Sequence, residues 1–431
     1  MKEYGRFLWR CFRVSFVGNR MYHGWMLLLT VLALIGLNAY AKQIVQGLAT
    51  TGMTDQVSWG LYISNFTFLV GMAAAAVMLV IPVYLYRNRE LHDLVIFGEL
   101  LAVAAIFMCL AFVVVDMGRP DRMHHMFMRF NFPMSMLTWD VIVLNVYLLL
   151  NMHICGYLVY CAYRKRKPGA LFYIPFVFVA IVWAVSIHTV TAFLYVGLGG
   201  RPFWNSAIIA PRFLASAFAA GPAFLILTLS VLDKWTSYDV PRKAIMTLRN
   251  IVTVALIINM FLLACEVFTE FYTGSAHGVS ARYLFLGLHG YSGLVPWIWT
   301  AIGLNTFALG VLCLPASRRQ GWLNLACGSL FIGIWIEKGM GLIVPGFIPS
   351  PLGEIVEYTP TLNESLVSIG IWAFGLALYT IFVRITIPVL SGNLTVDRLY
   401  EFGAASVPAE SDMSSTGSPS SSAPKDLEVS R

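Results

Sequence analysis

Seven ionisable side chains stand inside long apolar stretches of this sequence. In the hydrocarbon of a membrane, a charge costs at least about 2.5–3.5 kcal/mol on insertion scales. Such residues are kept where they pair, bind a ligand or carry protons, so they are the first candidates for chemistry. They are Glu99, Asp140, His153, His188, Glu266, His289 and Glu337, and Lys338 stands beside the last of them.

One group of polar residues gathers near the outer ends of four successive apolar segments. It mixes aromatic, acidic, basic, amide, hydroxyl and imidazole groups: Trp59, Tyr62, Asn65, Asp116, Arg119, Trp139, His188, Thr189 and Thr191. This mixture suits a quinone head group, whose carbonyls need donors and whose reduction takes up protons. We expect these residues to bind the quinone, with Asp116 and His188 as catalytic acid–base residues. Alternatively, Asp116 and Arg119 form an interfacial salt bridge and the tryptophans belong to the aromatic belt.

A second set of polar residues leads from this group towards the opposite membrane face. We expect Asp140, Asn145, His153 and Glu99, with waters between them, to carry protons to the quinone. The alternative is that they form hydrogen bonds that hold the helices together. Glu266, His289 and Glu337 form a corresponding but less coherent set later in the chain.

The sequence offers no ligand pattern for a bound metal, haem or iron–sulfur cluster. Its seven cysteines include no CxxC or CxxCH motif. As haem ligands, His153 and His188 would differ in depth by about 10 Å. We therefore expect the chain to hold no such cofactor and to exchange electrons through a partner.

The composition places these residues in a polytopic membrane protein. Hydrophobic residues make up 58% of the 431 residues and charged residues 12%, which excludes an ordinary soluble protein. We expect an all-α fold with ten membrane spans of about 20 residues each. They lie near 24–41, 58–86, 94–115, 136–162, 171–196, 211–232, 250–271, 283–314, 321–343 and 364–387.

The net charge of +7 reflects membrane topology and not a nucleic-acid partner. Of the 29 Lys and Arg residues, 21 fall at the two ends of the chain or in the even-numbered gaps between spans. The positive-inside rule then places both termini in the cytoplasm, in a multi-pass protein of the cytoplasmic membrane. We expect no signal peptide before the first span. The Ser- and Pro-rich tail, 403–431, is expected to be disordered.

The spans suggest an internal duplication. Spans 2–5 and 6–9 start at offsets near 150 residues and run in the same direction, as parallel repeats do. We therefore expect two four-helix bundles, 58–200 and 201–345, the first with the quinone site. A cytoplasmic N-terminus and first helix (1–57) and an outer loop with the tenth helix (346–402) would flank them.

Four segments together resemble the NrfD/polysulfide-reductase-C family, and most closely its ten-span branch of QrcD-, DsrP- and HmcC-like subunits. They are "WGLYISNFTFLVGMAAAAVML" (59–79), "VDMGRPDR" (115–122), "GRPFWNSAIIAPRFLASAFAAGP" (200–222) and "EKGMGLIVPGFIPSPLGEIVEYTPTLNE" (337–364). The resemblance implies a cofactor-free membrane subunit that exchanges electrons between a quinone pool and a periplasmic four-cluster iron–sulfur subunit. A multihaem cytochrome c often accompanies that partner, and a molybdopterin-family-like subunit is a further candidate.

The sequence and the resemblance lead to one preferred function. We expect the chain to pass electrons from its partner to exchangeable menaquinone within a respiratory complex, with proton uptake from the cytoplasm. A menaquinol-oxidising subunit of a Dsr- or Hmc-type complex is the first alternative. A secondary transporter, which would share repeats and midplane acids, and an inert membrane anchor are the others.

Overall fold

The computed structural model describes residues 2–73, 77, 79–80, 83, 94–236, 238–274 and 278–400. Within these ranges the chain is helical and nine helices are long and apolar enough to cross a membrane. The fold class, an all-α polytopic membrane protein, is confirmed. The shorter apolar helix α3 (Leu61–Ala73) lies in the second predicted span. The rest of that span falls partly, and the predicted disordered tail entirely, outside the described residues.

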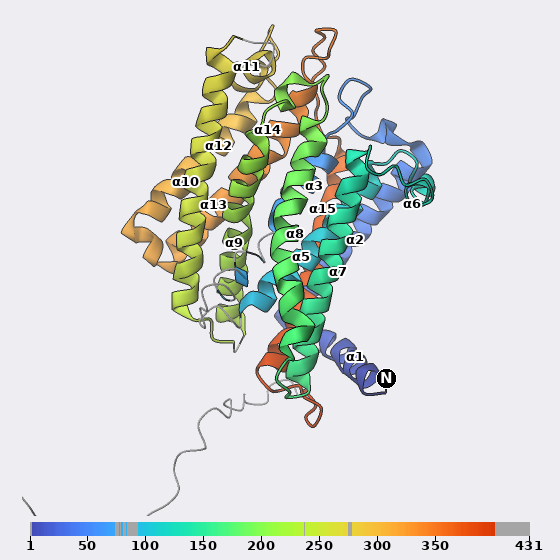
Figure 1. Ribbon diagram of the computed structural model, residues 1–431, viewed down its shortest axis with the longest axis vertical. Helices are drawn as coiled ribbons and strands as arrows, with labels where there is room; N and C mark the ends of the chain where they lie inside the picture. Colours follow the sequence, from blue (N-terminus) through green and yellow to red (C-terminus); the bar gives the residue numbers. More distant parts are fainter. Residues whose placement is uncertain are drawn as a thin grey trace, which may run out of the picture.

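Helix α3 and three of the long helices form a first bundle (Figure 1). In it, α3 packs on α5, α7 packs on α8, and α5 packs on α7. Every residue of α3 and most residues of α5 are buried, so these two helices meet protein on most sides. The other three helices of this bundle are α5 (Val95–Asp116), α7 (Met136–Tyr163) and α8 (Ala170–Val196).

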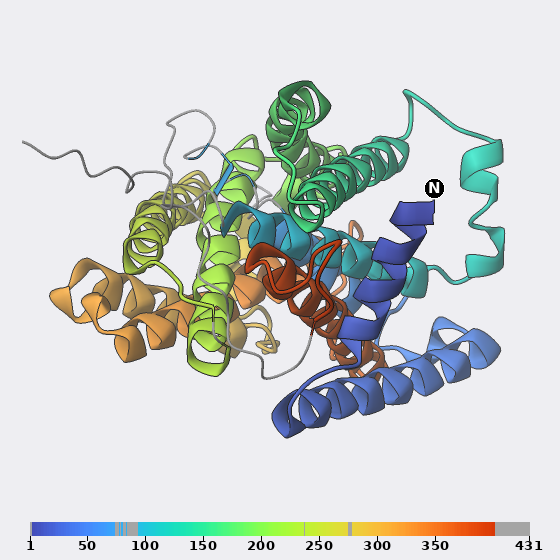
Figure 2. The ribbon, with the colours of Figure 1, turned by 90° about the horizontal axis from the view of Figure 1, so that it is seen from below.

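The next four long helices form a second bundle, which lies to one side of the first when seen from below (Figure 2). Helix α9 joins the two bundles, because it packs on α10 and α13 and also on α3 and α8. The two bundles therefore share an interface made by α3, α8, α9 and α13. The second bundle consists of α9 (Ile209–Trp235), α10 (Arg242–Tyr272), α12 (Val295–Cys313) and α13 (Gln320–Lys338).

Two outer helices, α2 (Arg20–Gln46) and α15 (Leu362–Leu390), pair with each other against the first bundle. Two glycines face each other between them: a Cβ built on Gly36 would lie 2.5 Å from the Cα of Gly370. Small residues let membrane helices approach closely, because lipid gives no hydrophobic force to drive apolar side chains together. This contact fixes how α2 lies on α15.

The predicted span 283–314 begins too early, because the chain makes two helices there and only the second is long enough to cross a membrane. Helix α11 (Gly278–Leu286) ends before a turn, and α12 begins only at Val295. Gly287, His289 and Gly290 all have positive φ in this turn, a conformation that ends a helix. His289 is consequently an exposed turn residue and not part of a long apolar helix.

The N-terminal segment forms a helix, α1 (Lys2–Ser15), that the sequence analysis did not predict. It lies at the lower end of the molecule in Figure 1 and contacts α15. Phe7 packs against the ring of Tyr163 with centroids 4.9 Å apart. Arg10 donates to the Tyr163 hydroxyl at 2.9 Å and to the Val396 carbonyl at 2.8 Å. Helix α1 is therefore fixed to the end of α7 and to the segment after α15.

Helix α13 is interrupted near the upper end of the molecule. It ends at Lys338, and the short helix α14 (Met340–Ile343) follows after Gly339. A Cβ on Gly339 would lie 2.6 Å from the Trp335 carbonyl oxygen and 3.2 Å from Cβ of Ser64 on α3. The break therefore brings the chain directly against the first bundle, where only glycine fits.

At the upper end, one buried carboxylate connects three segments of the chain. Glu364 of α15 accepts hydrogen bonds from the Leu61 amide (3.1 Å) and the Gly52 amide (3.1 Å). The Tyr358 hydroxyl donates to the same carboxylate at 2.5 Å. Burial, reinforced by Glu364, raises the pKa of Tyr358, so this hydroxyl stays protonated as a donor. Glu364 thus caps the first turn of α3.

We expect Gly36→Ala to destabilise the protein by about 1–3 kcal/mol, because the added methyl group meets the backbone of α15. Gly24→Ala on the same helix is the matched control, since a Cβ there meets nothing within 4 Å. Thermal unfolding of the purified protein in detergent measures the difference. Equal midpoints for the two variants would show that the α2–α15 contact is not tight.

The predicted orientation gives a second expectation. With both termini in the cytoplasm, a cysteine introduced at exposed Gly199, in the upper loop after α8, should react in intact cells with a membrane-impermeant maleimide. A cysteine at exposed Gly321, at the lower end of α13, should react only after permeabilisation. Both are placed in a Cys313→Ser background, which removes the exposed native thiol. The reverse labelling pattern would show that both termini lie outside the cytoplasm.

Candidate functional site

The core of the candidate site in the first bundle is a hydrogen bond between α7 and α8. Asp140 is 2% exposed, and its Oδ1 accepts a hydrogen bond from the Thr191 hydroxyl at 2.7 Å. The sequence analysis placed Thr191 among the quinone-binding residues and Asp140 in the proton route. The structure brings them together, so one buried pair belongs to both sets.

A second hydrogen bond, between α3 and α8, lies in the same region. The hydroxyls of Thr67 and Tyr195 are 2.5 Å apart, and both residues are buried. The Tyr195 ring packs against Trp59 (centroids 5.8 Å apart) and Trp204 (5.6 Å). The sequence analysis missed Tyr195, although it lies only a few residues before the quoted segment that begins at Gly200.

His188 is the buried imidazole of this region, with 1% of its surface exposed. Its Nδ1 lies 2.8 Å from the Ala184 carbonyl oxygen, one turn back on the same helix. Its Nε2 has no hydrogen-bond partner among the described residues. The Oδ1 atom of Asp116, at the end of α5, is likewise buried without a partner there. Both predicted catalytic residues therefore keep a buried polar atom available, and unpaired buried groups of this kind are costly unless a ligand or water uses them.

Tyr62 takes part in a hydrogen-bonded chain that reaches α2. Its hydroxyl donates to Gln43 Oε1 at 2.7 Å, and Gln43 Nε2 donates to the Val115 carbonyl at 2.6 Å. All three residues are buried. Gln43 was missed because α2 was expected to be a flanking helix without a part in the site.

The Asn65 amide is already engaged by other helices. Its Oδ1 accepts from the indole nitrogens of Trp335 and Trp372, both at 2.9 Å, and its Nδ2 donates to the Leu61 carbonyl. Asn65 therefore connects α3 to α13 and α15, and its amide is committed to protein contacts.

Three predicted quinone-binding residues do not join this cluster. Arg119 makes two 3.0 Å hydrogen bonds to Asp121 with an exposed side chain, so the alternative Asp116–Arg119 salt bridge is wrong. The Trp139 indole donates to the Pro133 carbonyl at 2.9 Å. Thr189 donates to the carbonyl one turn back on α8, on a different face from His188, because successive helical residues are about 100° apart.

The structure places His153 away from the other residues of the predicted proton route. This side chain is exposed, and its Nε2 lies 2.9 Å from the Phe172 carbonyl oxygen at the surface between α7 and α8. Asn145 is half-buried and donates to the carbonyl one turn back on its own helix. The physical reason is helix periodicity: positions 5 and 13 residues after Asp140 do not share its face.

The inward face of α7 carries a different polar set below Asp140. Tyr147, Asn151 and Cys155 recur at helical spacing and are all buried. Asn151 donates to the Tyr147 carbonyl at 2.7 Å, and the Cys155 thiol donates to Glu99 at 3.3 Å. Glu99 is 1% exposed, so it is an interior carboxyl as predicted, but it is reached through Cys155 and not His153.

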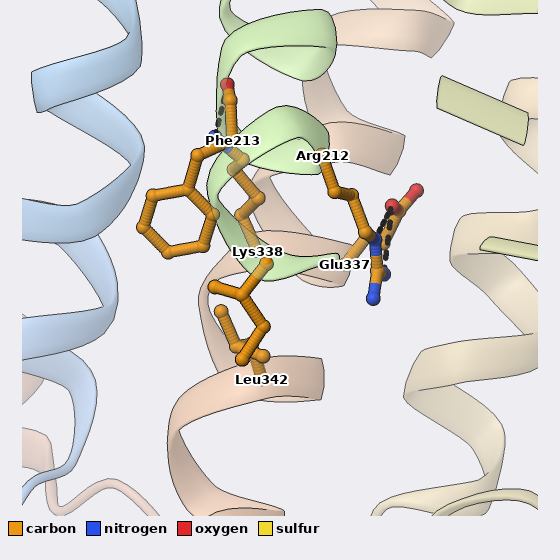
Figure 3. Close-up of a pocket in the computed structure, with 6 residues that line it drawn as sticks. Arg212, Phe213, Glu337, Lys338 and Leu342 are labelled. Carbon is orange, nitrogen blue, oxygen red and sulfur yellow. Dashed lines mark hydrogen bonds and ion pairs between the residues drawn. The ribbon is translucent and has the colours of Figure 1, made fainter. Parts of the chain in front are cut away.

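The second bundle holds a more coherent ionic network than the sequence suggested. Arg212 of α9 pairs with Glu337 of α13 at 2.9 Å and also contacts the Glu266 carboxylate of α10 (Figure 3 shows the Arg212–Glu337 pair). Glu337 further accepts from the amides of Asn259 (3.2 Å) and Asn305 (2.8 Å). Two predicted residues, Glu266 and Glu337, therefore meet at an arginine that the sequence analysis had not selected, whereas His289 lies outside this network.

Lys338 does not pair with its neighbour Glu337. Its Nζ donates to the Phe213 carbonyl at 2.7 Å and lies 4.1 Å from the centre of the Phe213 ring. Figure 3 shows the lysine directed at Phe213 while Glu337 points the other way to Arg212. With 3% of its surface exposed, Lys338 is a buried amine at the interface of the two bundles.

Two cavities border Arg212. One, in Figure 3, is lined by Phe213, Glu337 and Lys338 among others. The other extends from Arg212 past Glu266 and Glu270 to α11 and has room for about one water. Among the described residues, no three His, Cys, Asp or Glu side chains are grouped so that they could hold a metal ion.

Comparison with known proteins finds one matching family model and several relatives named as subunits of oxidoreductases. A family model described as "Polysulphide reductase, NrfD" matches residues 49–347. A putative dimethyl sulfoxide reductase membrane subunit of Halobacterium salinarum is 26% identical, over 82% of this chain and 88% of the relative. An Hdr-like menaquinol oxidoreductase integral membrane subunit of Archaeoglobus fulgidus is 21% identical (84% and 93%). A selenate reductase subunit of Mesobacillus selenatarsenatis is 22% identical (86% and 95%).

The ionic network predicts the effect of losing its cation. Arg212→Met should destabilise the protein by about 3–5 kcal/mol, because two buried carboxylates lose their compensating charge. Arg201→Met, which removes a half-buried guanidinium 4.6 Å from the Phe347 ring, should cost far less. The yield and the thermal midpoint of the detergent-purified variants measure this. Equal losses would mean that the network does not depend on Arg212.

Proposed function

Because this chain belongs to the polysulphide reductase NrfD family, we propose that it is the quinone-interacting membrane subunit of a respiratory oxidoreductase complex. The observation that carries the proposal is the buried His188 imidazole, whose Nε2 has no partner among the described residues, in the helix that also supplies Thr191 and Tyr195. The relative from Archaeoglobus fulgidus, named a menaquinol oxidoreductase subunit, supports menaquinone as the quinone.

The proposed site uses His188 and the Thr67–Tyr195 pair as the groups nearest the head group. Because the Nδ1 hydrogen of His188 is directed at the Ala184 carbonyl, Nε2 of the neutral imidazole is an acceptor that can take a proton from a hydroquinone hydroxyl, whereas the Tyr195 phenol can donate a hydrogen bond to a quinone carbonyl. Reduction of menaquinone takes two electrons and two protons to give the hydroquinone. His188, Asp116 and the Asp140–Thr191 pair are the acid–base groups placed to handle those protons.

Access to the site requires side chains to move, because its residues are closely packed. Trp59 is half-buried, whereas Tyr195 and Trp204 behind it are fully buried. The Trp59 ring stacks on Trp204 with centroids 5.7 Å apart. We infer that Trp59 stands at the entrance and that its displacement opens the aromatic slot for the quinone ring.

Protons for the reaction would come from the lower end along α7. A revised series of buried polar groups leads to Asp140. It consists of Glu99, Cys155, Asn151 and Tyr147. Waters would have to complete it, as in other membrane proton relays. Proton uptake from the cytoplasm with electron delivery from the outside would make turnover electrogenic.

Electrons would be delivered by a periplasmic iron–sulfur subunit, with a multihaem cytochrome c or a molybdopterin-family-like subunit as further members of the complex. The loop between α5 and α7 supports docking at this end, because it exposes large apolar side chains next to basic ones. Figure 1 shows its short helix α6 (His125–Met128) projecting from the upper part of the molecule. The exposed apolar residues are Met123, Phe127, Met128, Phe130, Phe132 and Met134. Such a patch favours an interaction surface.

Menaquinol oxidation is the second candidate. Two relatives are named as subunits of dimethyl sulfoxide and selenate reductases, which favours electron flow from the quinol to a terminal reductase. The same acid–base residues would then accept protons from the quinol. A transporter and an inert anchor are supported by no comparison, and they would not require the available His188 nitrogen.

We expect His188→Ala to lower turnover with a soluble naphthoquinone at least about 100-fold while the complex stays assembled, because a proton-exchanging group contributes about 10²–10⁴. Thr189→Ala is the matched control, since that hydroxyl bonds only within α8. Turnover is measured on the purified complex with reduced methyl viologen as the donor. Unchanged turnover in the His188 variant would reject its role.

A further inference from the structure

The N-terminal helix α1 uses only one side to contact the rest of the protein. Its buried residues are Phe7, Cys11 and Val14, and the rings of Phe7 and Tyr160 of α7 have centroids 5.2 Å apart. With 14 residues, α1 is too short to cross the hydrocarbon core. Figure 1 shows it at the lower end of the molecule, oblique to the long helices. Helix α1 therefore lies beside the membrane-spanning helices, and its other sides face the surroundings.

Two contacts show which side of α1 faces away from the membrane. Glu3 pairs with Arg164 at 3.1 Å, and Arg10 donates to the Val396 carbonyl at 2.8 Å. Arg164 follows the last residue of α7, and Val396 lies beyond the end of α15. Because both partners lie past the ends of membrane-spanning helices, the side of α1 that carries Glu3 and Arg10 is directed out of the membrane.

The opposite side of α1 is apolar and exposed. At 3.6 residues per turn, Phe12 lies about half a turn around the helix from both Glu3 and Arg10. Its ring contacts those of Trp9 (centroids 5.7 Å apart) and Phe16 (5.0 Å). Trp9 is 61% exposed and Phe16 is 65% exposed. The geometry therefore turns a set of large apolar side chains towards the membrane, and Tyr4 and Leu8 complete it.

A row of basic residues borders this apolar side. Lys2, Arg6 and Arg13 are spaced by four and seven residues, so they share one side of the helix, and Trp9 lies one turn from both arginines. All three basic side chains are exposed, and no ion pair among the described residues includes them. From Lys2 to Arg13 the row extends over about 16 Å. The α7–α8 loop adds three more exposed cations beside α1: Lys165, Arg166 and Lys167.

The depth of α1 is that of lipid head groups. It packs on the last two turns of α7, where Tyr4 meets Tyr160 (centroids 5.5 Å apart) and Phe7 meets Tyr163 (4.9 Å). Tyrosines at the end of a membrane span are typical of the interface between hydrocarbon and water. A helix with a basic row and an apolar side rich in Trp, Phe and Leu binds in this interface.

We propose that α1 and the α7–α8 loop form a binding site for anionic phospholipid head groups. The basic row and the loop cations contact the phosphates, and the apolar side of α1 lies among the upper parts of the acyl chains. The bound lipid holds the lower end of α7 at the membrane surface. The site does not depend on the proposed quinone chemistry, and it requires only that this end of the molecule meets a membrane surface, in either leaflet.

The first test measures lipid binding to the full-length chain. The delipidated protein in detergent is titrated with dioleoylphosphatidylglycerol or dioleoylphosphatidylcholine, and native mass spectrometry counts the bound lipid. We expect the triple variant Lys2→Gln/Arg6→Gln/Arg13→Gln to raise the Kd for phosphatidylglycerol at least about tenfold, because each basic residue near an anionic surface contributes roughly a factor of five. The Kd for zwitterionic phosphatidylcholine should change less than about twofold.

A matched control separates a specific site from overall charge. The triple variant Lys234→Gln/Arg318→Gln/Arg319→Gln removes the same charge from exposed positions at the lower end of the second bundle. We expect it to change the Kd for phosphatidylglycerol less than about twofold, because these residues lie more than a Debye length from α1. Equal losses in the two triple variants would overturn the proposal, as would a wild-type protein that binds both lipids equally.

A second measurement distinguishes lipid from a soluble protein partner. A nitroxide label is placed at Phe12→Cys or at Arg166→Cys in the Cys313→Ser background, and the protein is reconstituted into vesicles of phosphatidylcholine and phosphatidylglycerol. We expect the label at position 12 to collide more with oxygen than with a water-soluble nickel chelate, and the label at position 166 to show the reverse. A label at position 12 that favours the nickel chelate would overturn the proposal, because the apolar side would then be open to water.

Discussion

The Arg212–Glu337 ion pair is the interaction on which the arrangement of the two bundles depends. A buried guanidinium is tolerated only with compensating charge and hydrogen bonds. The charge comes from Glu266 of α10 and Glu337 of α13. Glu337 is in turn held by the amides of Asn259 of α10 and Asn305 of α12. This requirement fixes the end of α13. The break at Gly339 then places the following residues against α3, so the polar network of one bundle determines how closely the other can approach.

The first bundle uses its buried polar groups differently. Two hydrogen bonds join its helices, one between Asp140 and Thr191 and one between Thr67 and Tyr195. By contrast, His188 keeps one nitrogen without a partner among the described residues. Paired groups stabilise the bundle, and the unpaired one is available for a ligand. The combination of a rigid polar frame with one available acid–base group is what quinone chemistry requires, and this distinguishes the first bundle from the charge-paired network of the second.

Much of the fold could be predicted from the sequence because hydrocarbon imposes simple rules. Apolar segments of sufficient length located the long helices, and ionisable residues within them identified Asp140, His188, Glu99, Glu266 and Glu337 as buried. The turn before α12 was missed because the flanking apolar residues conceal it, although Gly287, Gly290 and Gly293 indicate a break. Helix α1 was missed because it is too short and too basic to span a membrane.

The residues of the site were harder to predict, because depth in the membrane does not specify the face of a helix. Thr189 and His153 have suitable depths and chemistry but point elsewhere. The polar clusters also contain three residues that were not selected: Tyr195, Gln43 and Arg212. They were missed because single aromatic, amide and basic residues near span ends are common at membrane interfaces. A strict check of helical spacing from Asp140 would have selected Tyr147, Asn151 and Cys155 over Asn145 and His153.

The most direct test of the central claim is to locate the bound quinone by photoaffinity labelling. An azido-naphthoquinone cross-linked to the intact complex and mapped by peptide mass spectrometry should modify the upper halves of α3 and α8, around Thr67 and His188, and excess menaquinone should suppress the label. Labelling confined to the second bundle or to lipid-facing helices, with none in α3 or α8, would contradict a quinone site in the first bundle.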